Sequence, residues 1–324
     1  MNGAVRVEAE HRFALFWGGG LGDLLAIRPL LMALTERLEA PPYLFTTADH
    51  LEGLFEALGL EVQLHVLPTA PRDALAVFRR LGLRFDWIYL GPYVRLKTRL
   101  LAQVVGAERI WSRRHPEAGA FIGEQISADV RALGLVAPSQ PYGGGAGLAR
   151  AQVAVPRDYL VFHPGAKPRW ETTRWPEERW RGLLQRILAA SAAHVVLVGV
   201  EPERPMLESL LEGLDADARG RVQLAADWSL PQLVSAVEGS RGVVCHNSGV
   251  LHLAAALGKP TLALTGSSAR YWRPPYPHVM NLTSGACGLA CNQYRCPVPF
   301  YRARCIRELE VEAVMQAARG LLRL

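Results

Sequence analysis

Asp23 is the acidic residue of the first half whose setting best suits chemistry. It ends the segment Gly18-Gly19-Gly20-Leu21-Gly22-Asp23, after an apolar run at 13–17 and before a helical pattern at 24–38. Glycine lets a backbone approach a bulky ligand, and a carboxylate at a helix entrance can take a proton from an incoming hydroxyl group. Asp23 stands where a dinucleotide fingerprint needs its third glycine, so such a cofactor is not expected at this loop.

Two interpretations of Asp23 follow from this position. The structural one is a local cap on the helix, a frequent role of aspartate at a helix start. The functional one is a general base, and its neighbours then form the loop on the acceptor side. These neighbours are Gly19, Gly20 and Gly22.

A basic loop in the second half suits a phosphate ligand. It begins with His163-Pro164-Gly165-Ala166-Lys167 and leads to a helix at Trp175-Pro176. Small residues, cations and a helix start can together cradle a diphosphate. Helix initiation alone would explain the sequence from Trp175 onward, but not the cations before it. We therefore expect donor contacts from His163, Gly165, Ala166, Lys167, Arg169 and Arg174.

A second polar loop links an apolar strand to a short helix at 250–257. A serine or asparagine can cap such a helix, whose first amides are then available to a ligand. For His252 the structural alternative is a satisfied, partly buried side chain. The donor candidates of this loop are Asn247, Ser248, Gly249, Val250 and His252.

Two acids follow the apolar strand at 193–200. Glu201 and Glu203 occupy a place from which an acid can hydrogen-bond a ribose. A simple surface charge is the equal alternative for both, and the sequence does not choose between them.

Four cysteines cluster near the C-terminal end of the chain. They are spaced Cys287-x3-Cys291-x4-Cys296-x8-Cys305, while the fifth, Cys245, lies apart. Four thiols this close can hold a structural zinc or iron ion, although the spacing is not that of a paired zinc ribbon. Buried free thiols or a labile disulfide explain the same cluster, and both interpretations stay open.

Alternating strand and helix patterns must position all these loops. Apolar runs, such as those at 159–163 and 193–200, alternate with helical spacing, such as that at 203–214 and 311–322, through both halves. This alternation indicates parallel sheets covered on both faces. Proline and glycine accumulate between about 135 and 157, as in a linker. The sequence therefore predicts an α/β protein of two domains, 1–150 and 151–324, whose last helix is free to pack back on the first domain. In such sheets ligands bind at the carboxyl ends of the strands, where these loops fall.

Composition narrows the classes of partner. The formal net charge of +6 comes almost entirely from arginine, because the chain has only three lysines, Lys97, Lys167 and Lys259. This excess suits an anionic substrate or an anionic membrane surface, and equally a scattered solvated surface. There is no basic run with interleaved aromatics, so nucleic acid is not expected. Without a signal peptide or an apolar membrane span in the sequence, we expect a cytoplasmic protein, at most peripheral to the inner membrane.

Taken together, these motifs resemble glycosyltransferase family 9, the ADP-heptose:lipopolysaccharide heptosyltransferases. The similarity follows the family order along nearly the whole chain and ends in the cysteine-bearing tail. The motifs that carry it are Gly22-Asp23 with Pro29, His163-Pro164-Gly165-Ala166, Trp175-Pro176, Asn247-Ser248-Gly249-x-x-His252-Leu253-Ala254-Ala255-Ala256-Leu257-Gly258-x-Pro260, and Cys305-Ile306-Arg307-Glu308-Leu309.

The resemblance implies a GT-B architecture, with two Rossmann-like, doubly wound parallel-sheet domains facing a cleft. The acceptor would bind in the first domain and the nucleotide sugar in the second. Asp23 would be the base of an inverting, metal-independent transfer that requires no cofactor. The Asn247-Ser248-Gly249 loop would contact the sugar and diphosphate of the donor.

The implied function is transfer of a heptose or related sugar from an ADP-sugar to an acceptor hydroxyl, in synthesis of lipopolysaccharide core or another glycoconjugate. The acceptor could be a glycolipid, a protein or a small molecule. Two alternatives stay open: a nucleotide-sugar epimerase of the same architecture, and a non-catalytic nucleotide-sugar-binding protein.

Two departures from the family pattern fall on the donor side. The family usually has a lysine where this chain has Thr173, and an aspartate where it has Asn247. Thr173 therefore joins the donor-binding candidates, with Arg174, Arg169 or Lys167 left to supply the missing charge. Asn247 can still hydrogen-bond sugar hydroxyls through its amide.

Overall fold

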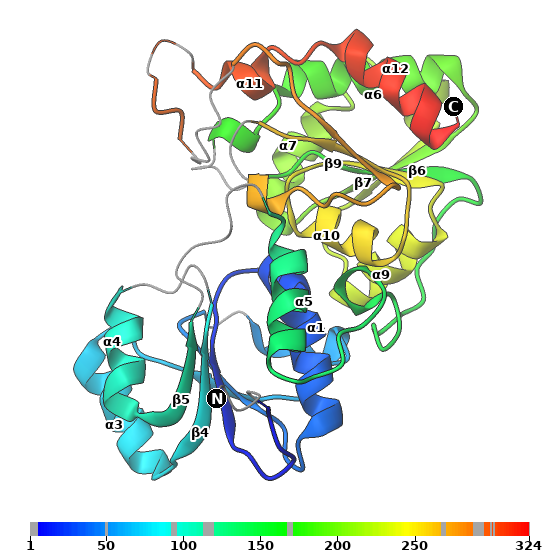
Figure 1. The fold of residues 1–324 in the computed structure, drawn as a ribbon. Coiled ribbons are helices and arrows are strands. Elements are labelled where there is room, and N and C mark those ends of the chain that lie inside the picture. Colours follow the sequence, from blue (N-terminus) through cyan, green and yellow to red (C-terminus); the bar gives the residue numbers. More distant parts are fainter. Residues whose placement is uncertain are drawn as a thin grey trace. The chain divides into compact units, whose positions relative to one another are not determined.

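The chain divides into two compact units, residues 1–149 and 150–324, which are described separately below (Figure 1). The computed structural model describes residues 6–48, 51–91, 96–112, 120–166, 171–266, 270–287, 295–298, 300 and 302–323. Each unit is built around one parallel sheet with helices between successive strands.

The sheet of unit 1 has the strand order β3-β2-β1-β4-β5, and every neighbouring pair is parallel. The central strand β1 therefore pairs with β2 on one side and with β4 on the other, and the chain returns to β4 only after it has formed β3 at the edge. This reversal makes the carboxyl end of β1 the switch point at which such sheets bind ligands. The strands are β1 (Phe13–Phe16), β2 (Tyr43–Thr46), β3 (Gln63–Val66), β4 (Phe85–Leu90) and β5 (Ala107–Ser112).

Helices in unit 1 follow the strands in the order that a doubly wound sheet requires. The long helix α1 begins directly after β1 and lies beside α5 (Figure 1). One face of the sheet packs an aromatic cluster in which Phe45 contacts Phe16 and Phe78 at ring-centroid distances of 5.3 and 4.5 Å. The helices are α1 (Leu21–Arg37), α2 (Glu52–Ala57), α3 (Pro71–Leu81), α4 (Leu96–Val105) and α5 (Ile122–Ala132).

A buried arginine in α1 ties the end of unit 1 to this helix. Arg28 is fully buried and donates hydrogen bonds to the carbonyl oxygens of Leu58, Tyr142, Gly144 and Ala146, the first three at 3.0, 2.9 and 2.7 Å. Burial lowers the pKa of Arg28 to about 10, so the guanidinium stays charged at neutral pH. The proline- and glycine-rich stretch expected to be a linker is thus, over residues 142–146, part of the packed first unit.

The sheet of unit 2 has the order β11-β10-β9-β6-β7-β8, again parallel throughout. Its first strand, β6, lies between β7 and β9, so the switch point is at the carboxyl ends of β6 and β9. The strands are β6 (Tyr159–His163), β7 (His194–Val198), β8 (Val222–Ala225), β9 (Gly242–His246), β10 (Thr261–Leu264) and β11 (Val279–Leu282).

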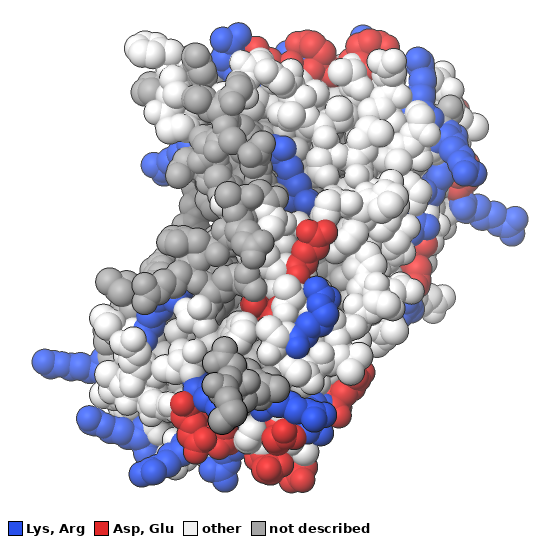
Figure 2. Space-filling view, in the orientation of Figure 1, with Lys and Arg blue, Asp and Glu red and all other residues white. Residues whose placement is uncertain are grey.

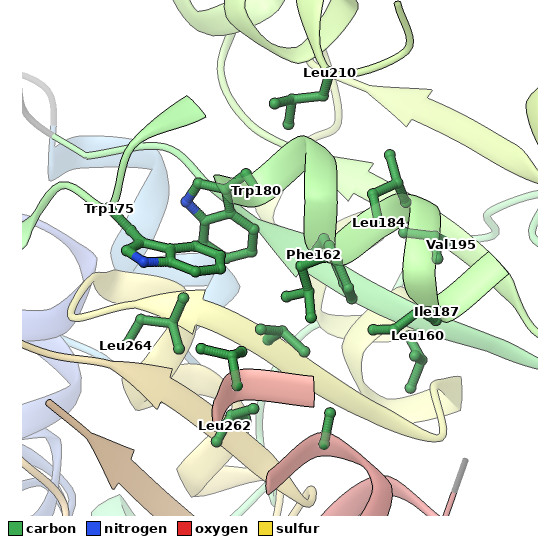
Figure 3. Packing of buried hydrophobic residues seen from close by; sticks show 14 of the residues in the cluster. Leu160, Phe162, Trp175, Trp180, Leu184, Ile187, Val195, Leu210, Leu262 and Leu264 are labelled. Atoms are coloured by element: carbon green, nitrogen blue, oxygen red, sulfur yellow. The ribbon is translucent and has the colours of Figure 1, made fainter. Parts of the chain in front are cut away.

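The core of unit 2 packs helices α6 and α12 against this sheet. Phe162 of β6 meets Trp180 of α6 edge-on at 5.8 Å, and Trp175 meets Trp180 at 5.4 Å (Figure 3). The last helix, α12, lies beside α6 and contacts β10 (Figure 1). The helices are α6 (Glu177–Ala190), α7 (Arg204–Ser209), α8 (Ala216–Gly220), α9 (Leu230–Gly239), α10 (Gly249–Ala256), α11 (Arg304–Arg307) and α12 (Val311–Leu322).

The strand and helix pattern predicted from sequence matches these elements in order. The structure adds α4, β5 and α5 in unit 1, and α8, β11 and α11 in unit 2. It also shortens the helix expected at 203–214 to α7. Among the described residues no helix is both long and apolar enough to cross a membrane.

Candidate functional site

Asp23 lies in the first turn of α1, directly after the switch-point strand β1. Its Oδ2 accepts a hydrogen bond of 2.8 Å from the backbone N–H of Gly20, and its carbonyl oxygen accepts one of 3.0 Å from Nε1 of Trp17. The residue is half-buried. Asp23 therefore caps its own helix, as the structural interpretation expected.

Capping does not use up the acceptor capacity of the carboxylate. An ionised carboxylate offers about four lone-pair positions on two oxygens, so it can accept a local bond and a second proton donor together. Space in front of the loop is available at Gly20, where a side chain would meet no atom of the described residues within 4 Å. Gly22 lies one residue before Asp23 in the same turn and is half-buried. Whether Asp23 acts as a base stays a prediction.

The loop before Asp23 is held by Trp17. This side chain is buried, and its ring lies where a Cβ on Gly91 would come within 2.4 Å, so β1 and β4 pack tightly at their carboxyl ends. Gly19 has a φ of +126°, a region that favours glycine, and the Asp23 side chain lies over it. The glycine at position 19 thus allows the Asp23 side chain to pack closely against the loop that precedes it.

In unit 2, two of the predicted donor residues meet across the switch point. Oγ of Ser248, after β9, lies 3.1 Å from Nδ1 of His163, at the end of β6. Ser248 is the N-cap residue of α10, but its side chain makes no capping bond and serves His163 instead. Burial lowers the pKa of His163, while the Glu203 carboxylate acts in the opposite direction.

Glu203 is placed at the same edge of the sheet. Its carboxylate lies over Gly165, because a Cβ on that glycine would come within 2.3 Å of Oε1. Oε2 accepts a hydrogen bond of 3.1 Å from the backbone N–H of Val200. Glu201, in contrast, is exposed and forms a two-point ion pair with Arg204 at 2.8 Å. The structure therefore brings Glu203, and not Glu201, into the cluster with His163 and Gly165.

Asn247 carries an unsatisfied polar atom at this edge. The residue is 8% exposed, and its Nδ2 has no hydrogen-bond partner among the described residues. A buried donor left unpaired costs about 1–3 kcal/mol, so a ligand that accepts this bond gains from it. The first amides of α10, at Gly249 and Val250, follow directly and also lack partners within the helix.

His246 organises the loops around the site, although sequence reasoning did not select it. Its Nε2 accepts hydrogen bonds from the backbone N–H of Trp175 at 2.8 Å and from Nε1 of Trp180 at 3.2 Å. Nδ1 must then carry the proton, and it lies 3.3 Å from the carbonyl oxygen of Gly165. Burial lowers the pKa of His246 to about 3, so the ring is neutral. The sequence pattern selected the loop that follows His246, but only spatial packing shows the role of His246 itself.

The remaining donor candidates differ in their access to a ligand. His252 is buried beside the ring of Trp272, at a centroid distance of 5.6 Å, and burial lowers its pKa to about 3. Thr173 is 1% exposed, whereas Arg174 is exposed. Ala166 is half-buried at the end of the described loop. Lys167 and Arg169 lie outside the described residues.

The cysteine cluster does not assemble into a metal site within the part of the chain that the structure describes. Cys287 and Cys296 are half-buried, Cys305 is buried, and all three are free thiols; Cys291 lies outside the described residues. No three potential ligands come together in the described ranges. Cys305 instead lies near Gly266, where a Cβ would come within 3.1 Å of its Sγ.

Comparison with known proteins agrees with the resemblance seen in the sequence. Residues 143–301 match the family model described as glycosyltransferase family 9 (heptosyltransferase). Lipopolysaccharide heptosyltransferase 1 of Pseudomonas aeruginosa is 32% identical over 163 residues, which cover 49% of this chain and 44% of that protein. Lipopolysaccharide heptosyltransferase 2 of Escherichia coli is 29% identical over 133 residues, covering 40% and 38%. The matched stretches thus span less than half the length of these curated relatives.

Solved structures match over nearly the whole chain. A family 9 glycosyl transferase from Veillonella parvula superposes with a TM-score of 0.74 at 16% identity, covering 99% of both chains. E. coli heptosyltransferase WaaC with ADP-2-deoxy-2-fluoro heptose gives 0.67 at 17% identity, covering 95% of this chain and 99% of that one. At these identities the likeness shows the fold, and the predicted GT-B class of two parallel-sheet units is confirmed.

Proposed function

We propose, from the match of residues 143–301 to the glycosyltransferase family 9 model, that this chain transfers a heptose or a related sugar from an ADP-sugar to an acceptor hydroxyl. The acceptor would belong to the lipopolysaccharide core or another glycoconjugate, as the names of the curated relatives suggest. The reaction would invert the anomeric carbon and require no metal.

The observation that carries this proposal is the polar cluster at the switch point of unit 2. Among the described residues Nδ2 of Asn247 has no hydrogen-bond partner, Oγ of Ser248 lies 3.1 Å from Nδ1 of His163, and the first amides of α10 follow. Amides at a helix start and a neutral histidine suit a diphosphate and its hydroxyl-bearing neighbours. The Glu203 carboxylate is an acceptor for ribose hydroxyls.

The acceptor side of the mechanism rests on Asp23. In the proposed single displacement, the acceptor oxygen attacks the anomeric carbon while its proton passes to the Asp23 carboxylate. The bond between the anomeric carbon and the phosphate oxygen breaks, and ADP leaves with the electron pair. The developing negative charge on the diphosphate would be stabilised by the α10 amides and by Arg174.

Incubation with ADP-heptose, with and without a heptose-free lipopolysaccharide acceptor, tests the proposal. A transferase releases ADP only when the acceptor is present, and the product gains one heptose by mass. Rearrangement of the donor without acceptor would indicate an epimerase. Donor binding without turnover in either mixture would indicate a binding protein, and either result would overturn the transferase proposal.

A further inference from the structure

Unit 2 has a second polar feature, a surface pocket of about 500 Å³ where the start of α6 meets the segment that leads into α11. Four arginines line it, Arg179, Arg302, Arg304 and Arg307, against two acids, Glu178 and Glu308. The pocket is therefore cationic. By contrast, Figure 2 shows red and blue side chains intermingled along the lower edge of the view, on unit 1.

Two of the four arginines are already engaged. Arg179 donates to the carbonyl oxygen of Leu309 at 2.6 Å and pairs with Glu310 at 2.9 Å. Arg304 pairs with Glu308. Within the described part of the chain, neither Arg302 nor Arg307 forms an ion pair, so the pocket presents two guanidinium groups to an external anion. Arginine binds phosphate oxygens in a two-point geometry.

An aromatic side chain stands at the rim of the same pocket. Phe300 is 92% exposed, the highest exposure among the large exposed hydrophobic residues of the described chain. Water solvates such a ring poorly, whereas the interface of a bilayer accepts aromatic rings at headgroup level. A soluble phosphate would use the arginines but would gain little from Phe300.

We infer that Phe300, Arg302 and Arg307 form a docking surface for an anionic bilayer. The guanidinium groups would bind lipid phosphates while the phenyl ring enters the interface. A basic side chain close to an anionic membrane surface increases partitioning by roughly fivefold. Loss of both arginines should therefore weaken vesicle binding by roughly 20- to 30-fold. The inference does not depend on the proposed transfer, because binding needs neither donor nor acceptor sugar.

Flotation of the full chain with vesicles tests this surface. Wild-type protein should float with phosphatidylcholine vesicles that contain phosphatidylglycerol, should not float with pure phosphatidylcholine, and should detach in high salt. The double variant Arg302→Gln/Arg307→Gln should lose most of the binding. Phe300→Ala should weaken it several-fold and keep its salt dependence.

A matched control removes the same charge elsewhere. Arg79 and Arg80, both exposed on α3, can be replaced by Gln in one variant that should float like wild type. Equal loss in this control, or no binding of wild type to the anionic vesicles, would overturn the inference. Thermal stabilisation by glycerol phosphate that needs Arg302 and Arg307, without vesicle binding, would assign the pocket to a small phosphorylated ligand instead.

Discussion

Cγ of Asp23 lies 2.1 Å from the position that a Cβ on Gly19 would occupy. The absence of a side chain on Gly19 therefore leaves the space that the Asp23 carboxylate occupies. The φ of +126° at Gly19 adds a second reason for glycine at this position.

Replacement of Gly19 by alanine should displace the Asp23 carboxylate and add about 1–3 kcal/mol of backbone strain. If Asp23 is the base, misplacing it by about 1 Å should lower kcat by roughly 100-fold. Steady-state kinetics with saturating donor would measure this. The matched control is Gly82→Ala at the end of α3, because it also places alanine at a positive φ, +59°, but meets no atom of the described residues within 4 Å. Equal activity of the two variants would contradict the pairing.

Substitution of Asp23 itself separates its two roles. Asp23→Asn keeps an oxygen that can accept the Gly20 N–H bond but cannot take a proton, whereas Asp23→Ala loses both. Both variants should lower kcat by about 10²- to 10⁴-fold with donor affinity retained. Only Asp23→Ala should also lose about 0.5–2 kcal/mol of stability, measured by urea unfolding. Near-normal turnover in Asp23→Asn would exclude the base.

Sequence reasoning was most successful where local pattern and tertiary packing agree. The run at 159–163 and the helix at 311–322 were predicted with their observed bounds, since each is strongly apolar or strongly periodic. The strand β5 was missed because it is largely exposed and carries charged residues. None of its six residues is fully buried, so it lacks the apolar run that marks the other strands. Its place in the sheet depends on pairing with β4, which no local pattern contains.

Gly165→Ala should lower donor affinity by displacing Glu203. A lost hydrogen bond to a charged group is worth about 1.5–3 kcal/mol, so the Kd for ADP should rise roughly 10- to 100-fold. Calorimetric titration of ADP would show this. In a Glu203→Ala background, Gly165→Ala should change the Kd for ADP little further, because both substitutions act through the Glu203 carboxylate. The control is Gly182→Ala in α6, where an added Cβ would make only ordinary contacts to Val311. Additive losses of ADP affinity in the double variant Gly165→Ala/Glu203→Ala would refute the coupling.

Asn247→Ala removes the unpaired Nδ2 and should affect ligand binding more than folding. Loss of one hydrogen bond should weaken ADP-heptose binding by roughly fivefold. Stability without ligand should change little, because the orphaned donor disappears with the side chain. Asn281→Ala on β11 is a suitable control, since its buried Oδ1 also lacks a hydrogen-bond partner within the described ranges. The measurement is the ligand-induced rise in Tm, and an unchanged rise in Asn247→Ala would remove this residue from the site.

Two buried neutral histidines should make unit 2 sensitive to acid. Burial lowers the pKa of both His246 and His252 to about 3 in the folded state, against about 6.5 in the unfolded chain. The folded state then resists protonation, so stability is complete above pH about 6.5 and falls as the pH drops toward 3. At pH about 5 each histidine should cost about 2 kcal/mol of unfolding free energy. His252→Gln should remove half of this loss in urea unfolding, and a pH-independent wild type would contradict the assignment.

The candidate site was only partly visible in the sequence. Motif spacing suggested His163, Ser248 and Glu203 as donor candidates, because each lies at or after the end of a strand, and the structure places all three at the same sheet edge. It could not show that Glu201 pairs with Arg204 while Glu203 turns toward Gly165, since the two acids differ by only two positions. Nor could it assign His246, whose role depends on the indole and amide groups that surround it in space.

The hydrogen bonds of Arg28 to distant carbonyl oxygens have a consequence for the folding of the first unit during synthesis. Three of its carbonyl partners come from residues 142–146, more than a hundred positions downstream. During synthesis, α1 therefore leaves the ribosome long before the carbonyl oxygens that accept hydrogen bonds from Arg28 have been made. Almost the entire first unit must leave the ribosome before the Arg28 guanidinium can form these hydrogen bonds. We therefore expect this unit to fold late and cooperatively rather than strand by strand.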